Sequence, residues 1–145
     1  MLNQIENIYD DRKEMMKRLK KRSYQCNMEL FREKYGHYFT EMTEYIDGAE
    51  EKEKAAEELA SVLVEAVDRK FRTKGRIGSG LQADLNMFTI YYVFPALLMT
   101  GHENASVIAD AICAKWSKAF KNSNISYTTY ERLYETFHEK IFGIF

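Results

Sequence analysis

The alternation of apolar and polar residues first predicts a very long helix at the start of the chain. Apolar residues recur at steps of three and four from about Asn3 to about Ile46, which is the spacing of one helix face. The apolar stripe shifts phase by about two residues between Lys20 and Met28, as expected at a break, kink or stutter. We predict that the helix breaks near Arg22–Asn27 or that one end projects and pairs with another chain.

A second helix is predicted from about Ala49 to about Arg72. The dipeptide Asp47-Gly48 before it is typical of a turn. Glutamates occupy its first turn and basic residues its last turn, which suits the helix dipole. Its apolar residues follow helical spacing: Ala56, Leu59, Ala60, Leu63, Ala66, Val67 and Phe71.

The most apolar part of the chain, Leu81 to Met99, allows two interpretations. Its aromatic and β-branched residues favour a strand, but the sequence predicts no other strand that could pair with it. Its apolar residues also recur at helical spacing, so we predict a buried central helix. We expect that helix to be kinked or restarted at Pro95, whose ring removes a hydrogen bond to Tyr91.

Three helix starts carry the spacing of a capping box, in which a Ser or Thr precedes a Glu or Gln by three residues. These pairs are Ser79–Gln82, Thr100–Glu103 and Thr128–Glu131. They predict the starts of the central helix and of two further helices, the last ending near Gly143. The sequence as a whole therefore predicts an all-α fold, a single-domain bundle of about five helices over residues 1–145, with a long and broken or kinked first helix.

Composition narrows the class of protein. A chain of 145 residues with 46% hydrophobic residues and one proline suits one globular domain. Its net charge of −1 gives no overall attraction to nucleic acid. The longest apolar run falls short of the ~20 residues that span a bilayer, and the first residues lack the features of a signal peptide. We predict a cytoplasmic protein that is not bound to a membrane.

The sequence offers little that is typical of catalysis or metal binding. Cys26 and Cys113 are far apart and lack a metal-binding or CxxC spacing. His102 and His138 are each followed by Glu, but the second His of a zinc-protease motif is missing. Glu135 and His138 make one Glu-x-x-His pair, whereas ferritin-like metal sites need two. We predict no catalytic residues, no metal site and no cofactor.

A basic run from Arg12 to Arg22 holds seven cations around Met15, Met16 and Leu19. As a basic amphipathic helix it would suit nucleic acid, an acidic protein or a membrane surface. The acidic stretch from Glu41 to Glu58 offers a counterpart within the same chain. We therefore favour a solvated face, or a charged seam between copies of the protein, over a nucleic-acid partner.

A glycine-rich basic loop precedes the central helix. Five basic residues occupy the eight positions from Arg69 to Arg76, next to three glycines. The loop matches neither the Walker A motif nor GxGxxG. It could still hold an anion through backbone N–H groups and the positive end of the next helix, or it could simply connect two helices, with Ser79 as the cap. The candidate anion-binding residues are Arg72, Lys74, Gly75, Arg76, Gly78, Ser79 and Gly80.

Two functions follow from these patterns. The first is a regulatory or protein-interaction protein without catalytic activity, which forms a homodimer or contacts a protein partner through its first helix. The alternative is a binding module for a phosphate-bearing ligand or nucleic acid, through the basic glycine loop at residues 69–80.

Overall fold

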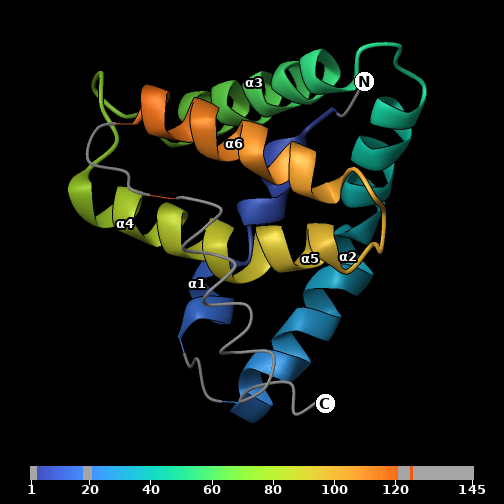
Figure 1. The fold of residues 1–145 in the computed structure, drawn as a ribbon. Helices are drawn as coiled ribbons and strands as arrows, with labels where there is room; N and C mark the ends of the chain where they lie inside the picture. The colour runs from blue at the N-terminus through green and yellow to red at the C-terminus, as the bar shows by residue number, and fades with distance from the viewer. Residues whose placement is uncertain (1–2, 18–20, 121–124, 126–145) are drawn as a thin grey trace.

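The computed structural model describes residues 3–17, 21–120 and 125. Over these residues the fold is all-α, as predicted, and contains no strand (Figure 1). A short 3₁₀ helix, η1, precedes five-residue α1 and long α2, and a π-helical turn, η2, joins α4 to α5. The bounds are η1 Ile5–Tyr9, α1 Arg12–Met16, α2 Lys21–Asp47, α3 Lys52–Phe71, α4 Ser79–Phe88, η2 Thr89–Val93, α5 Phe94–Leu98 and α6 Ala105–Ala119.

The core forms around the N-terminal segment. α3 and α6 lie side by side, and the helix formed by α4, η2 and α5 runs across beneath them in the view of Figure 1. In η1, Tyr9 is fully buried. Its ring lies 6.4 Å from that of Phe71 on α3, 5.4 Å from Phe88 on α4 and 6.2 Å from Trp116 on α6, between ring centroids. One aromatic side chain thus joins three helices.

The first helix is broken, but not at the predicted position. α1 ends at Met16, and residues 22–27 lie inside α2. The side chains of Lys34 and Tyr35 on α2 each donate a hydrogen bond of 2.8 Å to the Asp11 carboxylate. Residues 24 positions apart in a straight helix would be about 36 Å apart. The chain therefore turns back between α1 and α2, and this reversal accounts for the shifted apolar stripe.

α2 buries its apolar stripe within the protein. Seven residues at helical spacing are at most 4% exposed: Tyr24, Met28, Phe31, Tyr35, Phe39, Met42 and Ile46. Of the two alternatives for the first helix, the broken helix is therefore the one observed. Leu30, which is 57% exposed, is the large apolar side chain that α2 leaves most open to solvent.

The apolar segment after the glycine loop is the predicted central helix. α4, η2 and α5 follow one another without a gap, and Phe88, Tyr92 and Val93 are fully buried. The π-helical turn comes directly before α5, in which Pro95 occupies the first turn. Pro95 lacks an N–H group, and the carbonyl of Tyr91 instead accepts a hydrogen bond from the Tyr24 hydroxyl on α2. A neighbouring helix thus supplies the donor that proline cannot.

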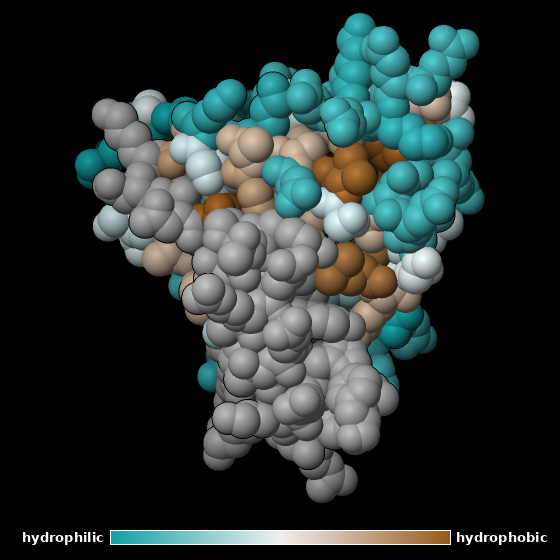
Figure 2. Space-filling model, viewed as in Figure 1, coloured by the Kyte–Doolittle hydropathy of each residue, from teal (hydrophilic) through white to brown (hydrophobic). Residues whose placement is uncertain are grey.

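The remaining predicted helices have mixed outcomes. α3 is confirmed to within three residues at its start and one at its end. α6 is also confirmed, and Figure 2 shows apolar residues along it beside the hydrophilic surface of α3. The Thr100–Glu103 capping box is wrong, because Asn104 is the N-cap and the Thr100 hydroxyl donates to Leu97 O. The helix predicted from Thr128 to Gly143 lies outside the described residues.

None of the described helices combines the length and the apolar character that crossing a membrane would require.

The basic run from Arg12 to Arg22 differs from the basic amphipathic helix that the sequence predicted. α1 ends at Met16, so the run is not one continuous amphipathic helix. The Arg12 guanidinium lies 4.7 Å from the centroid of the Phe71 ring, where it contributes to packing.

Candidate binding pocket beside the glycine loop

The glycine loop is a tight turn. Thr73 and Arg76 exchange two backbone hydrogen bonds, with N–O distances of 2.7 and 3.2 Å. The two residues between them, Lys74 and Gly75, have φ values of 53° and 82°. Positive φ at both central positions is the geometry of a type I′ turn, which glycine adopts without strain. Gly75 is therefore a conformational requirement of the turn.

Arg72 braces this turn. Its Nε and Nη2 atoms donate to Oδ1 of Asp68, one helical turn back on α3, and its Nη1 donates to the carbonyl of Gly75 at 2.7 Å. The hydrogen bond that the guanidinium donates to Asp68 raises the pKa of Arg72, which stays charged and paired. Arg72 therefore holds the loop in shape, and its charge is already balanced by Asp68.

The start of α4 differs from the predicted capping box. Gly78 is the N-cap, Ser79 is the first helical residue, and no side chain caps the helix. The Ser79–Gln82 capping box is therefore wrong. The first N–H groups of a helix have no partner within it, so at α4 they face the loop without a capping side chain. A Cβ added at Gly78 or Gly80 would meet only open space.

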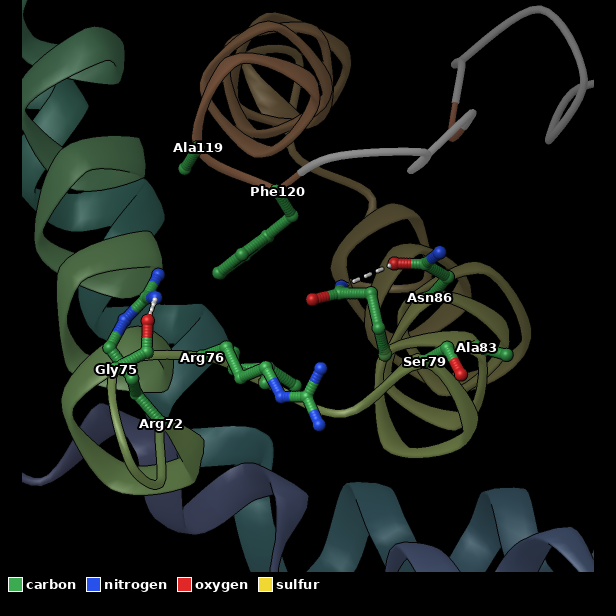
Figure 3. Close-up of a pocket in the computed structure, with 10 residues that line it drawn as sticks. Arg72, Gly75, Arg76, Ser79, Ala83, Asn86, Ala119 and Phe120 are labelled. Carbon is green, nitrogen blue, oxygen red and sulfur yellow. Dashed lines mark hydrogen bonds between the residues drawn. The ribbon is translucent and has the colours of Figure 1, made fainter.

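A pocket of about 680 Å³ opens between the loop, α4 and the end of α6. Its size falls in the range of ~300–1,000 Å³ that is typical of ligand pockets. Figure 3 shows Arg76 reaching from the loop toward α4, Arg72 held beside Gly75, and Phe120 entering from the end of α6. The described lining residues are Arg72, Gly75, Arg76, Ile77, Ser79, Gln82, Ala83, Asn86, Ala119 and Phe120.

Two polar groups of this pocket have no partner among the described residues. The Arg76 guanidinium forms no ion pair or hydrogen bond there, in contrast to Arg72. The hydroxyl of Ser79 likewise forms no hydrogen bond with a described residue. No described residue therefore competes with a ligand for these two groups.

A hydrogen-bonded chain connects the pocket wall to the core. The Trp116 indole nitrogen donates to Oδ1 of Asn86 at 2.7 Å, and the Gln82 amide nitrogen donates to the same oxygen at 2.9 Å. Trp116 is fully buried and Gln82 is 8% exposed. Sequence reasoning missed the pocket roles of Gln82 and Asn86. Two amides four residues apart on a mostly apolar helix were the signal that could have indicated them.

The structure brings together part of the predicted anion site. Arg72, Gly75, Arg76 and Ser79 line the pocket, whereas Lys74, Gly78 and Gly80 are not among its described lining residues. The sequence did not indicate Phe120, which reaches the pocket only because α6 ends beside the loop.

Other candidate residues have different surroundings. Cys113 is buried, and this burial raises the pKa of its thiol to about 12, as expected of a core residue. Cys26 is exposed. No three His, Cys, Asp or Glu side chains cluster as metal ligands in the described part of the chain. The Glu135–His138 pair lies outside it.

His102 forms a polar junction between α2 and α6. Its Nδ1 accepts from the backbone N–H of Asn104 at 3.0 Å, so the proton of the neutral ring is on Nε2. Nε2 then donates to Oδ2 of Asp47, at the end of α2, at 2.7 Å. With both nitrogens occupied, His102 fastens two helix ends together.

The groups described above are of the kind that would bind and orient an anion. Arg76, the Ser79 hydroxyl and the start of α4 offer donors on one side, while Ile77, Ala83 and Phe120 offer apolar surface. Among the described lining residues there is no histidine or carboxylate that could act as a general base. The chain matches no family model, no curated protein and no solved structure.

Proposed function

We propose that this protein is a binding module for a small ligand that carries a phosphate group. The pocket between the glycine loop, α4 and the end of α6 is the binding site. The observation that supports this proposal most strongly is the Arg76 guanidinium, which lines the pocket and has no ion pair among the described residues. The pocket is larger than an inorganic phosphate ion needs, so the ligand has a second part.

The positive charge and the helix start act on the same anion. A helix N-terminus carries about half a positive charge and presents free N–H groups. A guanidinium adds a planar pair of donors that fits phosphate oxygens. Ser79, at the first position of α4, adds a hydroxyl donor. Because Arg72 is paired with Asp68, the proposal assigns the phosphate contact to Arg76.

The apolar part of the lining indicates the rest of the ligand. Ile77, Ala83 and Phe120 face the pocket beside the polar groups. The Phe120 ring packs edge-on against Trp116, with centroids 4.8 Å apart, so its position is fixed by the core. We therefore expect an organic phosphate whose carbon skeleton contacts this wall.

The alternative of self-association through the first helix has less support. Its motivation was a long apolar stripe that needed a partner, and the stripe of α2 is buried within one chain. A nucleic-acid partner is also less favoured, because the basic run does not continue as one helix beyond Met16. Self-association and a cytoplasmic location remain predictions.

The test is isothermal titration calorimetry with propyl phosphate, a phosphate monoester without a hydroxyl group in its chain. We expect saturable binding by the wild type and binding roughly ten- to hundredfold weaker in Arg76→Ala, since one charge-assisted hydrogen bond contributes ~1.5–3 kcal/mol. Arg69→Ala is the matched control, because Arg69 is exposed and is not among the lining residues.

Two results would contradict the proposal. One is the absence of saturable binding of propyl phosphate by the folded wild type, and the other is unchanged affinity in Arg76→Ala. A second titration uses a single-stranded DNA oligonucleotide in place of propyl phosphate. If it binds while propyl phosphate does not, the loop is a nucleic-acid contact and the small-ligand proposal is wrong.

A further inference from the structure

The pocket wall contains a buried amide whose orientation is fixed. Gln82 is 8% exposed, lines the pocket and donates its amide hydrogen to Oδ1 of Asn86. The same oxygen accepts from the indole N–H of Trp116. An indole nitrogen can only donate, so Asn86 must present its oxygen to Trp116, and Gln82 must present its nitrogen to that oxygen.

The orientation leaves one atom of Gln82 without a partner. Its Oε1 accepts no hydrogen bond from any described residue. A ligand donor at this oxygen would form a hydrogen bond that no described residue supplies. Among the described side chains, Arg12 Nε is the one nitrogen or oxygen that is both enclosed away from solvent and without a hydrogen-bond partner. Gln82 Oε1 has no such partner either, so it is not enclosed. The oxygen is therefore reachable from the pocket.

Gln82 lies one helical turn beyond the proposed phosphate contact. Ser79 and Gln82 are three residues apart and both line the pocket, so they share one face of α4, with Cβ atoms ~5–6 Å apart. A doubly charged phosphate has no hydrogen to donate, and its oxygens are repelled by an acceptor. The phosphate therefore fits at Arg76 and Ser79. Gln82 Oε1 would instead accept a hydrogen bond from a donor group of the ligand, about one helical turn away from the phosphate.

We propose that Gln82 Oε1 selects a ligand that carries a hydroxyl or amino donor a few bonds from its phosphate group. This inference rests on the proposed function and specifies its ligand class, a phosphate monoester of a polyol or an amino alcohol. Trp116 and Asn86 act as positioning residues, since the hydrogen bonds at Asn86 Oδ1 fix the orientation of the Gln82 amide. The apolar wall then contacts the carbon chain between the two polar groups.

The test compares two probes that differ only in donors, sn-glycerol 3-phosphate and propyl phosphate. We expect the wild type to bind the glycerol ester roughly three- to tenfold more tightly, as one gained hydrogen bond predicts. In Gln82→Met, which keeps the length of the side chain and removes the acceptor, the two probes should bind alike. In Ser79→Ala both should weaken and the preference should remain.

The outcomes separate this inference from the proposed function. Equal binding of both probes by the wild type would overturn the role of Gln82 and leave phosphate binding intact. Binding of neither probe would overturn both. A preference that persists in folded Gln82→Met would assign donor recognition to another residue and overturn this inference. If Gln82→Met does not fold, the wild-type comparison alone decides.

Discussion

Two junctions between helices both carry polar side chains, but those side chains are hydrogen-bonded to one another at one junction and face a pocket at the other. At the junction of α2 and α6, Asp47, His102 and Asn104 satisfy one another through hydrogen bonds. At the junction of α3 and α4, the side chains of Arg76 and Ser79 have no hydrogen-bond partner among the described residues and line a pocket. The sequence predicted a capping box at both places, and both predictions were wrong. Polar groups that the fold satisfies serve stability, and those that it leaves open toward a pocket are available for binding.

The largest expected effect lies where the pocket joins the core. Asn86→Leu removes the acceptor of both Trp116 and Gln82 and leaves the buried indole N–H without a partner. We expect the free energy of unfolding to fall by about 2–4 kcal/mol in urea denaturation. Asn86→Asp is the control, because a carboxylate can accept both hydrogen bonds. Equal losses in the two variants would show that the shared acceptor is unimportant.

The next largest loss of stability is expected at the junction of α2 and α6, where Asp47, His102 and Asn104 are hydrogen-bonded to one another. His102→Leu removes the hydrogen bonds to Asp47 and to the N–H of Asn104. We expect a loss of roughly 1–2 kcal/mol in the free energy of unfolding. Asp47→Ala should cost a similar amount, and the double variant should cost less than the sum of the two. Strict additivity would mean that His102 and Asp47 do not act as a pair.

The glycines of the open junction should respond with opposite signs. Gly75 has a φ of 82°, so Gly75→Ala should destabilise the protein by about 1–2 kcal/mol. Gly80 lies in α4 with open space around its Cβ position, so Gly80→Ala should stabilise by roughly 0.5–1 kcal/mol. Thermal and urea unfolding of the pair would measure both. A loss at both positions would indicate that the loop needs glycine for another reason.

Features of the fold that depend on residues close together in the sequence could be predicted, whereas those that depend on contacts between distant residues could not. The stripe of α2 and the core of α3 follow from helical spacing, and the irregular π-helical turn before Pro95 fits its missing N–H. The reversal after α1 depends on contacts such as Asp11 with Lys34 and Tyr35, which sequence spacing does not encode. The capping predictions failed because spacing alone does not determine which residue becomes the N-cap.

The same limit applies to the candidate site. The basic residues and glycines of the loop were visible in the sequence, and part of them lines the pocket. The pairing of Arg72 with Asp68 could be recognised only once the geometry of the turn was known. Phe120 comes from the end of another helix, α6. The orientation of the Gln82 amide depends on Trp116, which is far from it in the sequence. Tertiary packing therefore decides which predicted residues form the site.

The smallest expected effect on stability is at the residue with the largest expected effect on binding. The Arg76 side chain is exposed and has no partner among the described residues, so Arg76→Ala should change the free energy of unfolding by no more than about 0.5 kcal/mol. At the same concentration, propyl phosphate should raise the melting temperature of the wild type more than that of the variant. A large loss of stability in the variant without ligand would give Arg76 a structural role, like that of His102.

The most direct test follows backbone amide shifts in two-dimensional ¹H–¹⁵N NMR spectra while sn-glycerol 3-phosphate is added. We predict that the shifts concentrate on Arg76 and on the first turn of α4, from Ser79 to Gln82. The amides around Asp47 and His102, at the satisfied junction, should not move. An absence of shifts at the start of α4, or shifts centred on the α2–α6 junction, would contradict the account.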